Sequence, residues 1–250
     1  FRSISERVHL AANGRILALA EQLSLDLVVV CDTCLLNLRE VNQRLRDDAV
    51  AAGEVNELLA QDGLSYSGKV EVKHFLWVLT EDIGLEPLRA RVATPLNGLR
   101  VAPFYGCHIQ RPESIFGAGG GEAPALDRLI EALGGEVVAY EGASKCCGFH
   151  VVTFAEKVSI RMAGQHLSAA KSAGAQCIAT PCPLCHTVMD MFQPQMEKEF
   201  RRHLGLPVLH VSQLVGLALG LRPADMNLSR HWVHAREVLA HLGRAAPARA

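Results

Sequence analysis

The spacing of apolar residues along the chain alternates between helical stretches and short strands. From Ser5 to Leu23, apolar positions recur at roughly helical spacing. Leu25–Val30 is apolar except for Asp26 and rich in β-branched residues, and it leads directly into a Cys-x-x-Cys sequence. A run of this kind between two helical stretches predicts a buried strand of a parallel sheet.

The same alternation continues along most of the chain. Further strands are predicted at Val70–Val72, Leu99–Pro103, Glu136–Tyr140, Ile178–Thr180 and Pro207–His210. Helices are predicted from Cys31 to about Leu45, over Ala51–Leu59, from His74 to near Gly84, over Leu126–Leu133 and Ala155–Ala173, from Pro183 through Phe200, and after His210. These elements predict an α/β fold with small parallel sheets flanked by helices.

One order of elements occurs twice in the sequence. It reads helix, apolar strand, Cys-x-x-Cys, helix, Val-x-His, apolar helix, Gly-Leu. The paired residues are Cys31 and Cys182, Cys34 and Cys185, and His74 and His210. This repetition indicates an internal duplication, with the cysteine motifs at the carboxyl ends of strands. We therefore expect a first half over residues 1–97, a complete second half over 98–240, and a disordered tail over 241–250.

Five cysteines in the second half have the spacing Cys-x38-Cys-Cys-Gly-x33-Cys-x-x-Cys. They are Cys107, Cys146, Cys147, Cys182 and Cys185. Adjacent cysteines form a strained disulfide, so ligation of one metal centre from several loops explains the set better. Thiolates are the ligands that iron–sulfur clusters need, and the start of a helix favours the anionic form of a thiol. Cys177 precedes its motif on a predicted strand, and we expect it to pack in the core instead.

This cysteine set, with its repeat, resembles the cysteine-rich CCG domain of the heterodisulfide reductase B-subunit family. The resemblance implies that the five cysteines hold a non-cubane [4Fe-4S] cluster, and that Cys31 and Cys34 belong to a second site. It also implies an iron–sulfur catalytic subunit that cleaves a disulfide reductively, or forms one in reverse. Its partners would be a C-like iron–sulfur subunit of the same complex, together with an A-like flavin protein. Its substrate would be a thiol or disulfide.

The duplication leaves Cys31 and Cys34 without a Cys-Cys-Gly of their own. Shifted by the repeat, those partners would fall just before Phe1. We therefore expect an upstream segment of about 40 to 50 residues with three further ligand cysteines.

Two alternatives stay open. Cys146, Cys147, Cys182 and Cys185 match a closed zinc site of four thiolates in a structural or interaction module. The chain is also compatible with an electron-transfer subunit of a quinone-linked dehydrogenase, because that class belongs to the family it resembles.

Histidines near the motifs are candidates for structural hydrogen bonding, for hydrogen bonds to the cluster ligands, for proton transfer or for binding zinc in place of iron. His108, His150 and His186 each lie within three residues of a motif cysteine, and His150 is the candidate proton carrier for a thiol product. His74 and His210 repeat with the fold and are predicted to be structural. The glycine-rich stretch Gly117–Gly121 lacks the lysine and hydroxyl of a phosphate-binding loop, so we expect a surface loop.

Composition and charge exclude several classes of protein. The 250 residues carry a net charge of -1, which does not favour nucleic acid or an anionic membrane as a partner. The most apolar stretch, Val208–Leu221, has about 14 residues, too few to span a bilayer. Eight cysteines in a chain of this length, with no visible signal peptide, indicate a reducing, cytoplasmic environment.

Overall fold

Six short parallel strands organise the part of the chain that the computed structural model describes, residues 5–117 and 124–244. Two of them, β1 (Leu27–Val29) and β2 (Val72–His74), form a two-stranded sheet. The other four form a second sheet in the order β4-β3-β5-β6. Their bounds are β3 Arg100–Pro103, β4 Glu136–Val137, β5 Cys177–Thr180 and β6 Val208–His210. The predicted α/β class with small parallel sheets is confirmed.

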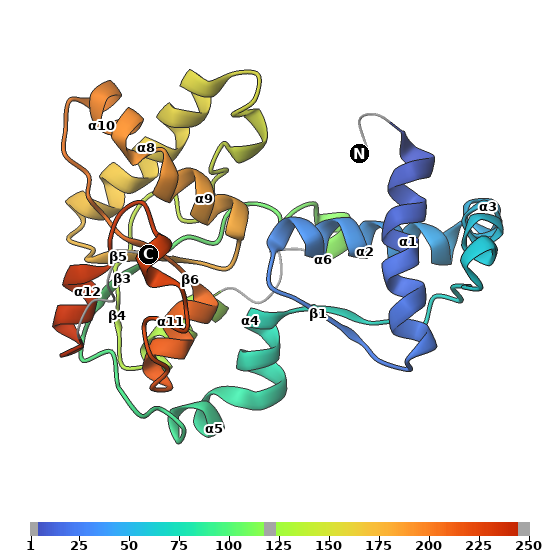
Figure 1. Cartoon of the computed structure of the whole chain (residues 1–250), viewed down its shortest axis with the longest axis horizontal. Helices are drawn as coiled ribbons and strands as arrows, with labels where there is room; N and C mark the ends of the chain where they lie inside the picture. The colour runs from blue at the N-terminus through green and yellow to red at the C-terminus, as the bar shows by residue number, and fades with distance from the viewer. Residues whose placement is uncertain (1–4, 118–123, 245–250) are drawn as a thin grey trace.

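The helices of the first half form a lobe beside the larger sheet (Figure 1). They are α1 Glu6–Gln22, α2 Asp32–Asp47 and α3 Ala49–Leu59, followed by the short 3-10 turn η1 Ala60–Asp62. After β2, the chain leaves this lobe through α4 Phe75–Trp77, the π-helix η2 Val78–Gly84 and α5 Leu85–Arg89. These three elements pack against α7, so the last part of the first half is in contact with the second half.

Helices cover the four-stranded sheet of the second half. The helical elements of this half are α7 Ala125–Ala132, η3 Phe149–Val151, α8 Glu156–Ser172, α9 Pro183–Met191, α10 Gln193–Phe200, α11 Val211–Ala218, η4 Leu228–Arg230 and α12 Arg236–His241. The short helix α6 Glu113–Phe116 packs instead against α2 of the first half. The side chains of Leu126 and Leu129 on the inner face of α7, and that of Leu133 directly after it, are completely buried. Residues 118–121 of the glycine-rich stretch and 245–250 of the tail lie outside the described residues.

The two halves share the register that the duplication predicts. Leu27 pairs with Val72 in the small sheet, and Ile178 pairs with Val208 in the large one. In both halves the strand ends two residues before the first cysteine of a Cys-x-x-Cys. Each motif therefore lies where a strand turns into a helix, as expected.

The first strand is less buried than the sequence predicts. In β1 the Val28 side chain is 53% exposed, and its neighbours Leu25 and Val30 are also exposed. In a strand, successive side chains point to opposite faces, and the described residues supply a helical layer for only one of them. The prediction of a fully buried strand is therefore wrong for this sheet.

Two predicted elements are interrupted or shortened. The helix expected from Pro183 through Phe200 breaks at Phe192, because Pro194 lacks an amide hydrogen and its ring would clash with a carbonyl one turn earlier. The strand expected over Glu136–Tyr140 is reduced to two residues at the sheet edge.

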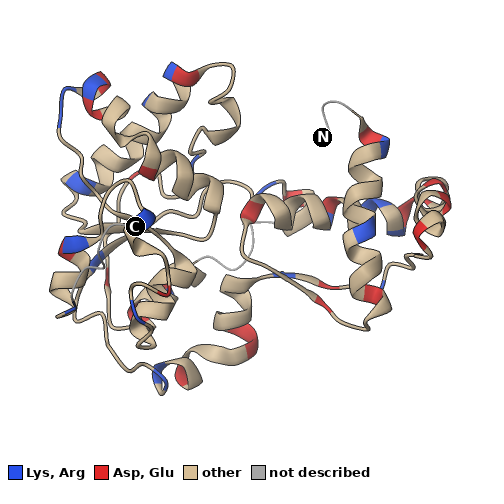
Figure 2. Cartoon of the chain, viewed as in Figure 1, with Lys and Arg blue, Asp and Glu red and all other residues tan. Residues whose placement is uncertain are grey.

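Charged residues of both signs are interspersed over the helices of both lobes in this view (Figure 2). None of the helices within residues 5–117 and 124–244 is both long and apolar enough to cross a membrane.

Candidate metal centre

The cysteine motifs of the two halves converge between the lobes. Cys31 occupies the N-cap position of α2 and Cys182 that of α9, each just beyond the carboxyl end of a parallel strand. Cys107 follows β3, the strand that pairs with β5. Because parallel strands end at the same edge of a sheet, Cys107 and Cys182 reach the same region.

The five thiols of the second half contact one another in a chain that runs from Cys107 to Cys182. Cys107 interacts with Cys146, which raises the pKa of Cys107 and lowers the pKa of Cys146 to about 2. Cys147 interacts with Cys146 and Cys185, and the first contact raises the pKa of Cys147 to about 12. Contacts with Cys147 and Cys182 raise the pKa of Cys185. These sulfurs compete for protons, as thiols do where several are packed at one site.

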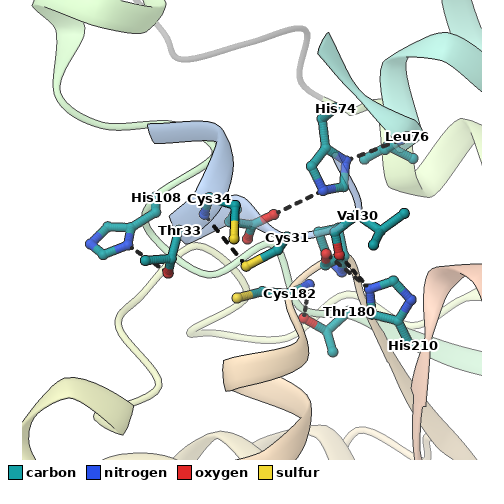
Figure 3. A network of polar contacts seen from close by, with 12 residues as sticks. Val30, Cys31, Thr33, Cys34, His74, Leu76, His108, Thr180, Cys182 and His210 are labelled. Atoms are coloured by element: carbon teal, nitrogen blue, oxygen red, sulfur yellow. Dashed lines mark hydrogen bonds and ion pairs between the residues drawn. The ribbon is translucent and has the colours of Figure 1, made fainter. Parts of the chain in front are cut away.

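The first half adds its two thiols to the same group. The Cys31 thiol interacts with Cys182 of the other half and with Cys34 of its own. Figure 3 shows the sulfurs of Cys31, Cys34 and Cys182 turned toward one another. The interaction with Cys31 lowers the pKa of Cys34 to about 7. Seven cysteines thus form one continuous set, and all of them are free thiols.

Cys177 lies apart from this set. It is fully buried on β5, and burial alone raises its pKa to about 12. The structure therefore places it in the core, where the sequence placed it.

The backbone at two glycines comes close to the sulfurs. The Gly148 amide donates a hydrogen bond to Cys146 Sγ at 3.3 Å, and Gly148 has a φ of 83°. A Cβ on Gly106, whose φ is 72°, would lie 3.1 Å from Cys185 Sγ. Both positions need a residue without a side chain, because the left-handed conformation and the close approach coincide there.

His108 and His150 line the pocket that holds the second-half cysteines. The Nδ1 atom of His108 lies 3.0 Å from the Thr33 hydroxyl, so the ring is held by the first half. The ring of His150 is exposed, with its centroid 5.0 Å from that of His108. His186 does not line this pocket, and its ring contacts that of His231 instead.

Asp32 is a pocket residue that the sequence analysis missed. It is 1% exposed, and neither carboxylate oxygen has a hydrogen-bond partner among the described residues. Burial raises its pKa, and its Oδ1 atom lies 3.5 Å from His74 Nε2. The repeat gave no signal for it, because Asp32 stands where the second half has Pro183.

The donor set suits an iron–sulfur group. Cysteine thiolates are the ligands of such clusters, and several thiols here lie at helix N-termini or accept backbone hydrogen bonds. Burial of Cys147, Cys182 and Cys185 provides the dry surroundings in which a cluster is shielded from water.

Comparison with known proteins gives consistent results. The cysteine-rich domain family CCG matches residues 101–190. The chain is 40% identical to the 8-methylmenaquinol:fumarate reductase membrane anchor subunit of Wolinella succinogenes, over 92% of this chain and 80% of that protein. It is 34% identical to the B subunit of the ferredoxin/F420H2-dependent CoB-CoM heterodisulfide reductase of Methanosarcina acetivorans, over 97% of this chain and 81% of the relative.

Two further similarities extend this result. A protein of Archaeoglobus profundus that is described as like the B subunit of heterodisulfide reductase is 33% identical over 85% of this chain and 73% of its own length. The crystal structure of a hypothetical protein from Helicobacter pylori superposes with a TM-score of 0.76, at 16% identity, over 93% of this chain and 43% of that one. At this identity, the second similarity shows the fold alone. From the relatives that are more than 30% identical, we conclude that the chain belongs to the family of proteins like the B subunit of heterodisulfide reductase.

Proposed function

We propose that the chain is the cluster-binding catalytic subunit of a heterodisulfide reductase-like complex. It would cleave a disulfide reductively to two thiols, or form the disulfide in reverse. The observation that supports this most is the convergence of cysteines from both halves on a pocket that also contains two histidines. A purely structural metal site needs neither the histidines nor the fifth cysteine.

The proposed ligands of a non-cubane [4Fe-4S] cluster are Cys107, Cys146, Cys147, Cys182 and Cys185. Cys31 and Cys34 are proposed for a second site, in keeping with a division into units over 1–97 and 98–240. When bound, such a cluster supplies electrons and a metal atom with affinity for sulfur.

The residues of the chain would bind the substrate and handle its protons. Cleavage of a disulfide consumes two electrons and two protons and gives two thiols. His150 is exposed at the pocket, so it can exchange protons with solvent and deliver one to a leaving thiolate. The hydrogen bond with Thr33 fixes the His108 ring beside it. The electrons would come from a C-like iron–sulfur protein of the complex, with an A-like flavin protein further upstream.

A second candidate is electron transfer within a quinone-linked reductase. The observation that favours it is the 40% identity to a subunit of a menaquinol:fumarate reductase. In that case the cysteine pocket would carry electrons without binding a disulfide.

Turnover of the anaerobically purified complex separates the two candidates. With a reduced viologen as electron donor, a disulfide reductase should release two thiols per disulfide consumed. A quinone-linked subunit should leave the disulfide intact and oxidise a menaquinol analogue in its complex. Thiol release that is unchanged in Cys147→Ala would contradict the proposed site.

A further inference from the structure

A second cluster of metal-binding side chains lies outside the cysteine pocket. It consists of His186, Asp190 and His231, and one potential ligand atom of each lies within 4.8 Å of the others. The two imidazole rings are nearly perpendicular, with centroids 4.7 Å apart. Asp190 is 5% exposed and His231 is 6% exposed, so the group is closed off from solvent on most sides.

The fold holds these side chains in place. His186 and Asp190 are four residues apart on α9, and residues at this spacing lie on the same face of a helix. The Asp190 carboxylate accepts hydrogen bonds from the backbone amides of Trp232 at 2.7 Å and Val233 at 3.0 Å. These bonds fix the carboxylate beside His231 and orient it without using all of its lone pairs.

Two ring nitrogens in the cluster have no hydrogen-bond partner among the described residues. They are His186 Nε2 and His231 Nδ1, and both atoms are buried. The Val208 carbonyl lies near both rings, but it has no hydrogen-bond geometry to either of these two nitrogens. A neutral imidazole is the form that binds metal, and an unpartnered buried nitrogen is costly unless a ligand occupies it.

We propose that His186, Asp190 and His231 bind a divalent transition-metal ion of the zinc class, separate from the cysteine-bound centre. The ligands are His186 Nε2, His231 Nδ1 and one Asp190 oxygen, and water completes a tetrahedral site. Two imidazoles and a carboxylate suit zinc, whereas thiolates suit iron–sulfur clusters. The ion would tie α9, which carries Cys185, to the segment that follows η4.

Gln213 makes this proposal more specific. Its side-chain nitrogen lies 2.9 Å from His231 Nε2 and also donates to the Met226 carbonyl. In this arrangement His231 Nε2 accepts, so the proton of the neutral ring resides on Nδ1. Metal binding at Nδ1 moves that proton to Nε2, and the Gln213 amide must then rotate to present its oxygen. Rotation removes the bond from the His210 amide to Gln213 Oε1.

Cobalt(II) tests the site, because its absorption spectrum distinguishes nitrogen and oxygen ligands from thiolates. The test uses the Cys31→Ser, Cys34→Ser variant, which should first be loaded anaerobically with iron and sulfide so that the second-half cysteines are occupied, and then treated with a chelator. Titration with cobalt(II) should give about one ion per chain, with ligand-field bands and without added thiolate charge-transfer absorption. His231→Gln and His186→Gln should each weaken cobalt binding roughly 10-fold or more, with unchanged iron content.

The control is His203→Ala, which removes an imidazole that is 80% exposed, pairs with Glu197 and is not a member of the cluster. It should bind cobalt as the unmodified protein does. Thermal unfolding provides a second readout: added zinc should raise the Tm of the unmodified protein and of His203→Ala, but not of His231→Gln. Absence of cobalt binding, or binding that both cluster variants retain, would overturn the proposal.

Discussion

His210 joins the two halves of the molecule by a hydrogen bond to the carbonyl of Val30, a residue 180 positions earlier, at 3.1 Å. The same Nε2 atom lies 3.0 Å from the Pro181 carbonyl. The ring can donate from Nε2 because Nδ1 accepts from the Ser212 amide. Val30 and Pro181 each precede the first cysteine of a Cys-x-x-Cys, so one imidazole positions both motifs.

His210→Ala should therefore destabilise the protein and loosen the contact between the halves. The substitution leaves two carbonyls without their donor, which costs roughly 1–3 kcal/mol if water does not replace it. Urea unfolding of the cluster-free protein measures the loss. His203→Ala, at an exposed position, should change the free energy of unfolding by less than about 0.5 kcal/mol. Equal stabilities of the two variants would contradict the role given to His210.

Gly106→Ala and Gly53→Ala should have opposite effects on stability. At Gly106 an added methyl group would lie 3.1 Å from Cys185 Sγ, and alanine would have to adopt the φ of 72° that glycine has there. We therefore expect the free energy of unfolding to fall by about 1 kcal/mol or more, and iron uptake to be reduced. Gly53 lies exposed within α3 with open space around its Cα, so alanine should stabilise the helix by about 0.5–1 kcal/mol. Thermal unfolding and iron analysis of both variants check this pair, and a stabilised Gly106→Ala variant would refute the close approach.

Asp32→Asn should stabilise the cluster-free protein at neutral pH. Burial raises the Asp32 pKa above its unfolded value, so the folded state binds more protons between those two values and loses stability as pH rises through them. The amide has no charge to desolvate, and the gain should reach roughly 1–3 kcal/mol above the folded pKa.

The pH dependence distinguishes this effect from simple repacking. The stability difference between Asp32→Asn and the unmodified protein should shrink as pH falls toward 4. Burial lowers the pKa of His74 to about 3, so protonation of this ring destabilises the folded state in the same acidic range. This effect is present in both proteins. Urea unfolding at several pH values measures the difference. A variant that is less stable at every pH would show that Asp32 makes a favourable interaction in the folded protein.

The sequence was sufficient to predict the elements that position the cysteines. β-branched runs before each Cys-x-x-Cys marked β1 and β5, and the repeated Val-x-His marked β2 and β6. Pro183 marked the first turn of α9, where its missing amide hydrogen costs nothing. These signals are local, so the sequence carries them without knowledge of the fold.

Tertiary relationships escaped the sequence analysis. The environment of Asp32 depends on packing between the halves, and nothing in its immediate sequence indicates that its carboxylate is buried. His231 lies far from the cysteine motifs, and only the fold brings it to His186. The exposure of Val28 likewise depends on which layers cover the sheet, which local hydrophobicity does not reveal.

Replacement of His150 by alanine should lower disulfide turnover by on the order of 100-fold without loss of iron, because general acid catalysis contributes about that much. Steady-state thiol release and iron analysis of the same preparation give the two quantities. His203→Ala serves as the control for a lost surface imidazole. Iron loss in the His150 variant would assign it a structural role, and unchanged turnover would remove it from the reaction.

The most direct test of the central claim is the iron and acid-labile sulfide content of anaerobically prepared protein and its cysteine variants. The cysteine set predicts about four iron and four sulfide ions for the second-half site. Cys107→Ala should lower this content sharply, whereas Cys177→Ala, which changes a thiol buried apart from the set, should retain it. Protein without iron and sulfide, carrying zinc that Cys146→Ala and Cys147→Ala lose, would contradict the account.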